Sequence, residues 1–514
     1  MTQVFDPVLL HAPVLNLAAN KPNAPALVLG RDVLTREQLQ DSVTQATSWL
    51  IECGCNKGDR IGICLPKSLY TVEAIYAALA AGVIFVPIDP AAPVARVAYL
   101  LNDADASLVL TYPAMAESLQ ASENPVKAKI ITIDGYDNFH QQVNHYHQDH
   151  TGPDVSANDI ALLYYTSGTT GTPKAIMLSH KNITAFTDWI INTFNITDND
   201  TIASHAPFHF DLSTLDLFAA PRIGAKVVLL DEANVKFPSS VSQIMENNKI
   251  TVWYSVPTAL IQLVHHGALP RRNLETLRLI FYAGEVFPVP ELKKLMEIFS
   301  WCEFVNLYGP TETNVCTYYR INEPLPDDAK DVPIGIACEH LQVTLIQEDG
   351  SDALQEAGGE IVVSGPAVMQ GYWNRPELTA HSRLNNDENT YRTGDFACRD
   401  SNGQLHLIGR KDDQVKIRGH RIELLEVMSV INLHPAVLES AVLLGDSDEN
   451  DAILTAFVTI KPSMSAEHHN ILEHCRQWLP KYAIPKHIIT LDHLPKTTTG
   501  KTDRQKLRQY LDIN

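Results

Sequence analysis

The chain has 514 residues, enough for two or more domains, and 45% of them are hydrophobic, an ordinary fraction for a globular protein. Sixty acidic against forty basic residues leave a formal net charge of −20, which argues against nucleic acid and anionic membranes as partners, because both need clustered Lys and Arg. We expect a cytoplasmic protein, because eight scattered cysteines show no C-x-x-C pair, no secretory signal is visible, and no apolar run could span a bilayer.

The amino-terminal part alternates predicted helices and strands. Thr35 is a predicted helix cap, and apolar positions recur at helical spacing from there through Ile51. Further on, strands at 60–65, 84–88 and 106–111 alternate with helices at 68–82 and 94–102. This spacing is typical of parallel α/β units, and the pattern continues to about Gly224.

Within this region, a loop of hydroxyl residues, glycines and a lysine separates two apolar runs. It reads Thr-Ser-Gly-Thr-Thr-Gly-Thr-Pro-Lys from Thr166 to Lys174. Glycines let backbone amides approach an anion, hydroxyls donate hydrogen bonds and lysine supplies charge, so we predict a phosphate-binding loop. The G-x-x-x-x-G-K-S/T motif does not fit, because the fifth residue after Gly168 is Pro173. Composition alone would also allow a surface turn.

Later predicted strands, at 250–257, 277–283 and 303–307, each end in a loop with polar or aromatic residues. Ligands usually bind at the carboxyl ends of strands in open α/β sheets, so these loops are candidate binding loops. Residues 334–408 have shorter strands and glycine turns, which indicates a β-rich subdomain.

The periodicity restarts after residues 409–413. Helices at 422–433 and 468–479 and strands at 441–445 and 452–461 predict a separate domain of ordinary size. The predicted fold is therefore α/β. A large body, residues 1–410, holds parallel α/β subdomains and a β-rich subdomain, and residues 411–514 form a small, mobile α+β domain.

The loop and several other spaced motifs resemble the adenylate-forming superfamily, which includes acyl-CoA synthetases, firefly-type luciferases and nonribosomal peptide adenylation domains. The other motifs are Tyr-Gly-Pro-Thr-Glu at 308–312, Tyr-Arg-Thr-Gly-Asp at 391–395 and Gly-Lys-Thr-Asp-Arg at 500–504. The resemblance covers residues 34–507. It implies that a carboxylate attacks the α-phosphorus of ATP, that pyrophosphate leaves, and that a thiol then takes the acyl group.

The resemblance also implies a role for each matching residue. Thr166, Lys174 and Lys501 would be catalytic, Glu312 would bind Mg²⁺, and Asp412 would be the hinge of the small domain. Rotation there would replace Lys501 by residues 416–423 for the thiol step. The implied nucleotide-binding residues are Thr166, Ser167, Gly168, Thr169, Thr170, Gly171, Lys174, Gly284, Glu285, Asn306, Tyr308, Gly309, Thr311, Asp395 and Arg410.

Three of these residues have ordinary alternatives. Glu312 could sit at a helix N-terminus, Asp395 could be a turn residue, and Lys501 could be an exposed lysine near the end of the chain. The surrounding motifs favour the functional roles. One position departs from the family pattern: Leu425 stands where relatives usually carry glycine, so we expect an altered start of the helix there.

The segment Phe-Asp-Leu-Ser at 210–213 resembles the amino-acid-activating branch, in which Asp211 would pair with the α-amino group of the substrate. Motif alignment gives the residues that line the substrate pocket as Asp211, Leu212, Leu215, Tyr254, Phe281, Ala283, Leu307, Val315, Cys316 and Lys501. This mostly apolar set predicts a small apolar amino acid. It closely resembles the set of stand-alone proline-activating enzymes, although alanine, valine and pipecolate stay open. No carrier motif is visible, so we expect the phosphopantetheinyl carrier protein to be a separate chain.

Other functions fit the same motifs less well. A coenzyme A ligase for a small carboxylic acid would have no use for Asp211, because its substrate lacks an amine. A D-alanyl carrier ligase would prefer a small D-amino acid. A catalytically silent adenylate-binding module is expected to lack Lys501 or Glu312, and both are present.

Overall fold

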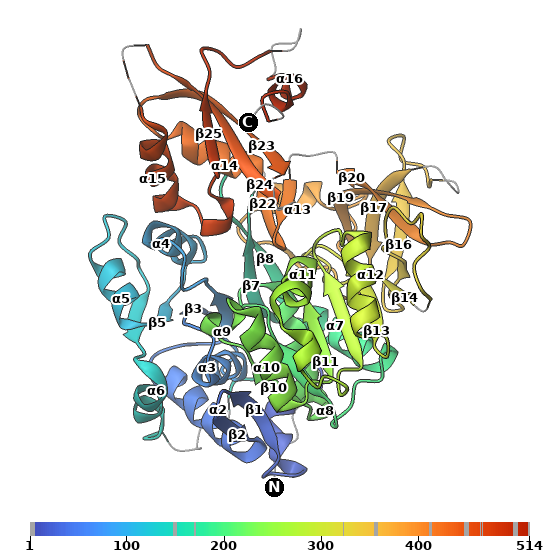
Figure 1. Ribbon diagram of the computed structural model, residues 1–514. Helices are drawn as coiled ribbons and strands as arrows, with labels where there is room; N and C mark the ends of the chain where they lie inside the picture. Colours follow the sequence, from blue (N-terminus) through green and yellow to red (C-terminus); the bar gives the residue numbers. More distant parts are fainter. Residues whose placement is uncertain are drawn as a thin grey trace.

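The fold is described from a computed structural model, which covers residues 6–146, 152–168, 171–321, 323–353, 358–410, 414–446, 452–462, 464, 466–496 and 502–511. Two large sheets form the body of the molecule, and a smaller domain lies against one end of it (Figure 1). Within the described ranges, no helix combines the length and the apolar character that crossing a membrane requires.

The larger sheet has parallel strands at its centre and antiparallel strands at its edges. Its strands, in spatial order, are β15 (Ile336–Ala337), β14 (Thr317–Ile321), β13 (Glu303–Tyr308), β12 (Leu279–Ala283), β11 (Val252–Ser255), β9 (Thr201–Ser204), β10 (Lys226–Leu229), β1 (Pro25–Leu29) and β2 (Asp32–Thr35). The strands from β13 to β1 run parallel. Their carboxyl ends therefore meet at one edge, where ligands are expected.

The second sheet is also mainly parallel, but it has antiparallel strands at one edge only. Its strands, in spatial order, are β18 (Gly371–Tyr372), β8 (Lys174–Ser179), β7 (Ile160–Thr166), β4 (Ile84–Pro87), β3 (Arg60–Cys64), β5 (Leu108–Thr111) and β6 (Lys129–Thr132). Strands β7 to β6 are parallel, whereas β8 pairs antiparallel with β7. The predicted phosphate-binding loop is thus the connection of a β7–β8 hairpin.

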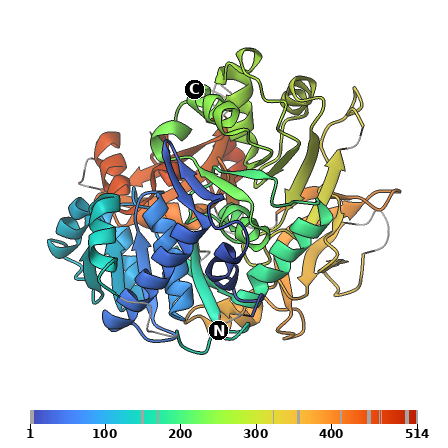
Figure 2. The same cartoon turned by 90° about the horizontal axis from the view of Figure 1, so that it is seen from below.

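Three smaller sheets complete the fold. The predicted β-rich subdomain is an antiparallel sheet of β16 (Gln342–Ile346), β17 (Gly359–Ser364), β19 (Thr390–Arg399) and β20 (Leu405–Arg410). A short hairpin follows, with β21 (Gln414–Ile417) and β22 (His420–Glu423). The small domain has a sheet of β23 (Val437–Asp446), β24 (Ala452–Ile460) and β25 (His487–Thr490). Seen from below, the blue, green and yellow parts of the body lie side by side (Figure 2).

Helices cover both large sheets and both faces of the small-domain sheet (Figure 1). The α-helices are α1 (Ala12–Leu15), α2 (Arg36–Glu52), α3 (Leu69–Ala80), α4 (Val94–Asp103), α5 (Pro113–Gln120), α6 (Gly135–Val143), α7 (His180–Thr193), α8 (Ala220–Ile223), α9 (Glu232–Val235), α10 (Pro238–Asn248), α11 (Pro257–His266), α12 (Val289–Ile298), α13 (Pro376–His381), α14 (Leu424–Asn432), α15 (His468–Trp478) and α16 (Arg504–Arg508). Four short 3₁₀ turns and one π-helix are η1 (Leu17–Ala19), η2 (Asp211–Ser213), η4 (Leu269–Arg271), η5 (Lys481–Ala483) and the π-helix η3 (Leu215–Ala219).

The main hydrophobic core lies between the two large sheets. Helix α3 is buried along its whole length, because it packs against α2 and against strands of both sheets. This burial explains why α3 is apolar on every side instead of amphipathic. The core joins the two halves of the body, so the loops at the carboxyl ends of both sheets are held at fixed positions.

Most predicted elements of the body are present with shifted ends. Thr35 caps α2, as the sequence predicted, and the structure shows that it does so in a capping box with Gln38. One prediction in the small domain is wrong at its start: a helix was expected from Ile422, but Ile422 pairs with Val415 in the β21–β22 hairpin. Strand pairing across the hairpin overrides the amphipathic pattern there, and α14 begins only at Leu424.

Candidate active site

A cavity of about 480 Å³ opens at the carboxyl ends of β12 and β13. Its lining includes eight residues that the sequence assigned to nucleotide or substrate binding: Gly284, Glu285, Asn306, Leu307, Tyr308, Gly309, Asp395 and Arg410. Gln414 and Lys416 of β21 line it from the side of the small domain. The fold therefore gathers residues from the larger sheet, the β-rich subdomain and the β21–β22 hairpin around one space.

Asp395 lies at one side of this cavity, where β19 pairs with β20. Tyr308 donates a hydrogen bond to Asp395 Oδ2 at 2.6 Å, and Arg410 donates to Oδ1 at 2.7 Å. The backbone amide of Asp395 is itself held by Thr393 Oγ1 at 3.0 Å. An ionised carboxylate has about four acceptor positions, so these two donors leave room for two hydroxyl groups.

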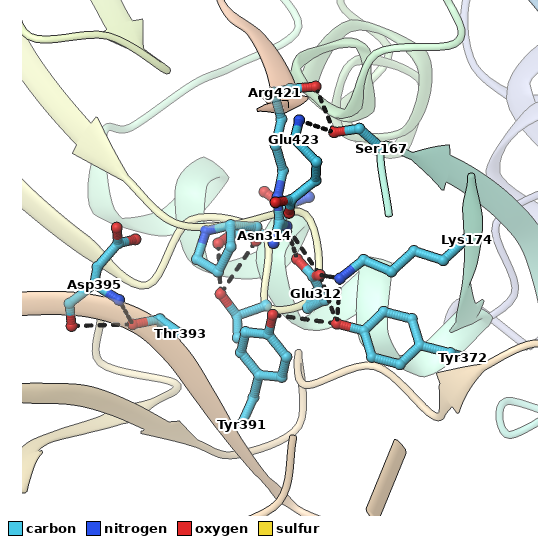
Figure 3. Close-up of polar contacts among 12 residues, drawn as sticks. Ser167, Lys174, Glu312, Asn314, Tyr372, Tyr391, Thr393, Asp395, Arg421 and Glu423 are labelled. Carbon is cyan, nitrogen blue, oxygen red and sulfur yellow. Dashed lines mark hydrogen bonds and ion pairs between the residues drawn. The ribbon is translucent and has the colours of Figure 1, made fainter. Parts of the chain in front are cut away.

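Glu312 is the centre of a buried charged cluster beside the cavity. Figure 3 shows Lys174, Tyr372 and Arg421 pointing at its carboxylate. Arg421 Nη1 donates to both oxygens at 2.9 and 2.8 Å, Tyr372 donates at 2.8 Å, and Lys174 Nζ lies 3.7 Å away. Burial alone would raise the pKa of Glu312, but the charges of Arg421 and Lys174 and the Tyr372 hydroxyl outweigh it and lower the pKa to about 2. Glu312 is therefore ionised at neutral pH.

Lys174 brings the phosphate-binding loop into the same cluster. Its ammonium donates to the Tyr372 hydroxyl at 3.2 Å. Burial and the neighbouring charge of Arg421 lower the pKa of Lys174 to about 8, against the opposing charge of Glu312. At the other end of the loop, Thr166 Oγ1 is buried and has no hydrogen-bond partner among the described residues. Both ends of the loop thus hold polar groups suited to an anionic ligand.

At both glycines of the loop, neighbouring atoms lie too close to leave room for a side chain. A Cβ at Gly168 would lie 1.8 Å from the carbonyl oxygen of Thr172. Gly171 has a φ of +84°, and a Cβ there would lie 2.3 Å from the Ser429 hydroxyl of α14. Side chains at these positions would therefore disturb either the loop or its contact with the small domain.

The β21–β22 hairpin of the small domain is hydrogen-bonded to the site at several points. The hydroxyl of Ser167 donates to the carbonyl of Arg421 at 2.8 Å and accepts from the amide of Glu423 at 3.1 Å (Figure 3). The amide of Gly419 donates to Glu285 Oε1 at 2.8 Å. Three separate contacts therefore fix this hairpin against the body.

Asp211 is carried by a loop that several hydrogen bonds hold in place. Lys67 donates to the carbonyl oxygens of Ser204 and Ala206 at 2.8 and 2.6 Å, and Thr214 Oγ1 donates to the carbonyl of Asp211 at 2.7 Å. Burial raises the pKa of Asp211, although a hydrogen bond from Thr311 and the charge of Lys416 oppose it. A cation beside Asp211 would therefore restore a stable carboxylate.

The predicted substrate-pocket residues other than Asp211 and Lys501 are buried and belong to the main hydrophobic core. They come from the loop and π-helix after β9, from β11, β12 and β13, and from the chain that leads into β14. Their exposed fractions lie between 0 and 7%: Leu212, Leu215, Tyr254, Phe281, Ala283, Leu307, Val315 and Cys316. Burial, followed by the charge of Asp211, raises the pKa of Tyr254, which places the two side chains in one electrostatic environment.

Sequence reasoning missed part of the cluster around Glu312. Tyr391 was quoted only as part of its motif, yet its hydroxyl lies 3.3 Å from that of Tyr372. No sequence signal singled out Tyr372, and Arg421 was noted only within residues 416–423. Four predicted site residues, Thr169, Thr170, Asp412 and Lys501, lie outside the described residues.

Comparison with known proteins agrees with this geometry. Residues 16–373 match the family described as AMP-binding enzyme, and residues 426–501 match the AMP-binding enzyme C-terminal domain. The chain belongs to the AMP-binding enzyme family. It is an ATP-dependent adenylating ligase, so the predicted family and enzyme class are confirmed.

Among its relatives in this family are two L-proline–(L-prolyl-carrier protein) ligases. The protein from Pseudomonas fluorescens is 35% identical over 510 residues, which cover 98% of this chain and 99% of that protein. The protein from Streptomyces coelicolor is 36% identical and covers 94% of this chain and 93% of its own length. A solved structure of an NRPS protein with adenylation and PCP domains, bound to a vinylsulfonamide inhibitor, is 26% identical with a TM-score of 0.81. That match covers 99% of this chain and 85% of the other, and it agrees with the predicted fold class.

Proposed function

We propose that this AMP-binding enzyme activates L-proline with ATP and transfers the prolyl group to the phosphopantetheine thiol of a separate carrier protein. The observation that carries the proposal is Asp211, a partly buried carboxylate whose predicted neighbours in the substrate pocket are mostly apolar and buried. The ammonium of an amino acid would neutralise this carboxylate, and the remaining surface suits a compact apolar ring. The names of the two nearly full-length relatives support proline and a carrier protein.

In the first half-reaction, an oxygen of the proline carboxylate attacks the α-phosphorus of ATP. The bond to pyrophosphate breaks and prolyl-adenylate forms. We assign the pyrophosphate to the loop from Thr166 to Lys174, the ribose hydroxyls to Asp395 and Arg410, and the adenine face to Tyr308. Lys501 would offset the negative charge that gathers between the carboxylate and the α-phosphate.

Glu312 is our proposed ligand for Mg²⁺. Its carboxylate is ionised and is a hard oxygen donor, which suits this cation. One protein carboxylate with phosphate oxygens and water is a usual magnesium environment, and the bound ion would offset phosphate charge. In the orientation seen here, Arg421 holds both oxygens of Glu312. The residues therefore fit a magnesium ion once the β21–β22 hairpin has moved away.

In the second half-reaction, the thiolate of the carrier attacks the carbonyl carbon of prolyl-adenylate. A thioester forms and AMP leaves with the electron pair of the broken bond. We assign this step to the present orientation, because the β21–β22 hairpin faces the cavity in it. We also propose that the two domains divide between residues 410 and 411 and that Asp412 is the hinge of the small domain. Finally, we propose a cytoplasmic location, which the eight free cysteines support because thiols stay reduced in the cytosol.

An amino-acid panel in ATP–pyrophosphate exchange tests the proposal. We expect L-proline to give the strongest exchange, ahead of pipecolate, alanine, valine and D-alanine, and Asp211→Asn to lose proline exchange selectively. Flat exchange with proline together with strong exchange for D-alanine would favour a D-alanyl carrier ligase. Thioester formation from a small acid and coenzyme A, with no exchange for any amino acid, would favour a coenzyme A ligase.

A further inference from the structure

A buried ion pair outside the lining of the cavity joins the large body to the small domain. Arg96 lies on α4 of the body and Glu426 lies in the first turn of α14. Arg96 Nη1 donates to Glu426 Oε1 at 2.7 Å, and the two side chains are only 12% and 7% exposed. The pair therefore differs from the exposed ion pairs of this protein, because solvent screens it weakly.

Other contacts also join the large body to the small domain. Helix α15 of the small domain packs on α4 and lies directly above it in Figure 1. Just after α15, the ring of Tyr482 stacks on His420 of the β21–β22 hairpin, with centroids 3.7 Å apart and planes 5° apart. On the side of the body, His420 lies 5.5 Å from the ring of Phe210, the residue before Asp211. These ring contacts connect the segment after α15 with the β21–β22 hairpin and with the loop that carries Asp211.

We propose that Arg96 and Glu426 are positioning residues for the thiol-transfer step, holding the small domain in the orientation that presents the β21–β22 hairpin to the cavity. The proposal rests on the two half-reactions proposed above. Neither residue lines the cavity or belongs to the Glu312 cluster. Their effect would therefore come from the orientation of the small domain and not from contact with a substrate.

The two charges attract each other strongly only while they face one another in the buried interface. If the small domain rotates to bring in Lys501, the pair separates and both side chains enter water. Neutralising one member leaves the other buried and unpaired in the present orientation only. The loss should then appear in transfer to the carrier and not in adenylate formation.

The test compares Arg96→Gln, Glu426→Gln and the charge-reversed double variant R96E/E426R with the wild-type enzyme. We expect each single variant to load the carrier protein ~30-fold more slowly in a single turnover. Proline-dependent pyrophosphate exchange should stay within about twofold, and the reversed pair should recover at least about tenfold of the lost loading rate. Arg476→Gln is the matched control, because its partner Glu473 lies on the same helix and both are about half exposed. It should change neither reaction.

Hydrogen–deuterium exchange gives a second readout that needs no substrate. Peptides covering residues 414–423 should exchange faster in both single variants than in the wild type, and should be unchanged in Arg476→Gln. The proposal would be overturned if a single variant lost pyrophosphate exchange and carrier loading equally, or if the charge-reversed variant loaded the carrier no faster than the single variants. It would also be overturned if the hairpin kept its wild-type protection from deuterium exchange in the single variants. If the proposed substrate is wrong, the wild-type enzyme itself shows no proline-dependent pyrophosphate exchange. The deuterium-exchange experiment needs no substrate, so it still tests the ion pair in that case. Should one single variant fail to fold, the other carries the same comparison.

Discussion

Replacing Arg421 by methionine should loosen the β21–β22 hairpin, because it removes the guanidinium from Glu312 and keeps most of the apolar stem. A pKa lowered from 4.5 to about 2 corresponds to ~3 kcal/mol in favour of the ionised carboxylate, at about 1.36 kcal/mol per pH unit. Glu312 is fully buried, so solvent screens this interaction little. Arg421 contributes more than Lys174 or Tyr372, so we assign ~2 kcal/mol to it, about 30-fold in the opening equilibrium.

The amide of Gly419 reports this opening, because it donates to Glu285 across the interface. In hydrogen exchange at neutral pH, we expect it to exchange ~30-fold faster in Arg421→Met than in the wild type. The folded pKa of Glu312 lies below its ordinary value, so the stabilisation is complete above about pH 4.5 and is lost as the pH falls towards 2. The exchange rates of the Gly419 amide in the two proteins should therefore become equal in acid. A difference that persists unchanged at pH 2, or no difference at pH 7, would refute the reasoning.

Three further substitutions test the proposed chemistry. Lys501→Ala should slow adenylate formation at least ~100-fold with ATP binding within about threefold by equilibrium dialysis; retained exchange would contradict its role. Asp211→Ala should raise the KM for proline ~100-fold and leave that for ATP within about threefold, because only the amino acid pairs with this carboxylate; equal losses would count against the pairing. Chelation of divalent cations should abolish ATP–pyrophosphate exchange. Glu312→Gln should raise the Mg²⁺ concentration that gives half-maximal pyrophosphate exchange about tenfold. An unchanged magnesium dependence would exclude Glu312 as the ligand.

Local signals in the sequence located most elements of the body. Thr35 followed by Gln38 is a capping box that acts within four residues, so it fixes the start of α2 without tertiary contacts. The small domain shows where such signals fail. The apolar pattern from Ile422 suited a helix, but Ile422 pairs with Val415 in a strand, and no local pattern shows which partner a strand will find.

In the candidate site, too, the sequence predicted some residues and missed others. The composition of the loop from Thr166 to Lys174 predicted a phosphate-binding loop, and the resemblance to the adenylate-forming superfamily predicted Glu312 and Asp395 as site residues. Neither signal could show that Arg421, more than a hundred residues further on, would hold both oxygens of Glu312. Tyr372 also joins that carboxylate without any sequence signal.

The sequence by itself determined which residue types are present, in what local order, and hence the family, the fold class and the chemistry they allow. Only the tertiary structure decided that the β21–β22 hairpin rests on Ser167 and Glu285 and that Arg96 faces Glu426. The reason is physical: capping and glycine conformation act within a few residues, whereas burial and ion pairing depend on chain segments that meet only after folding.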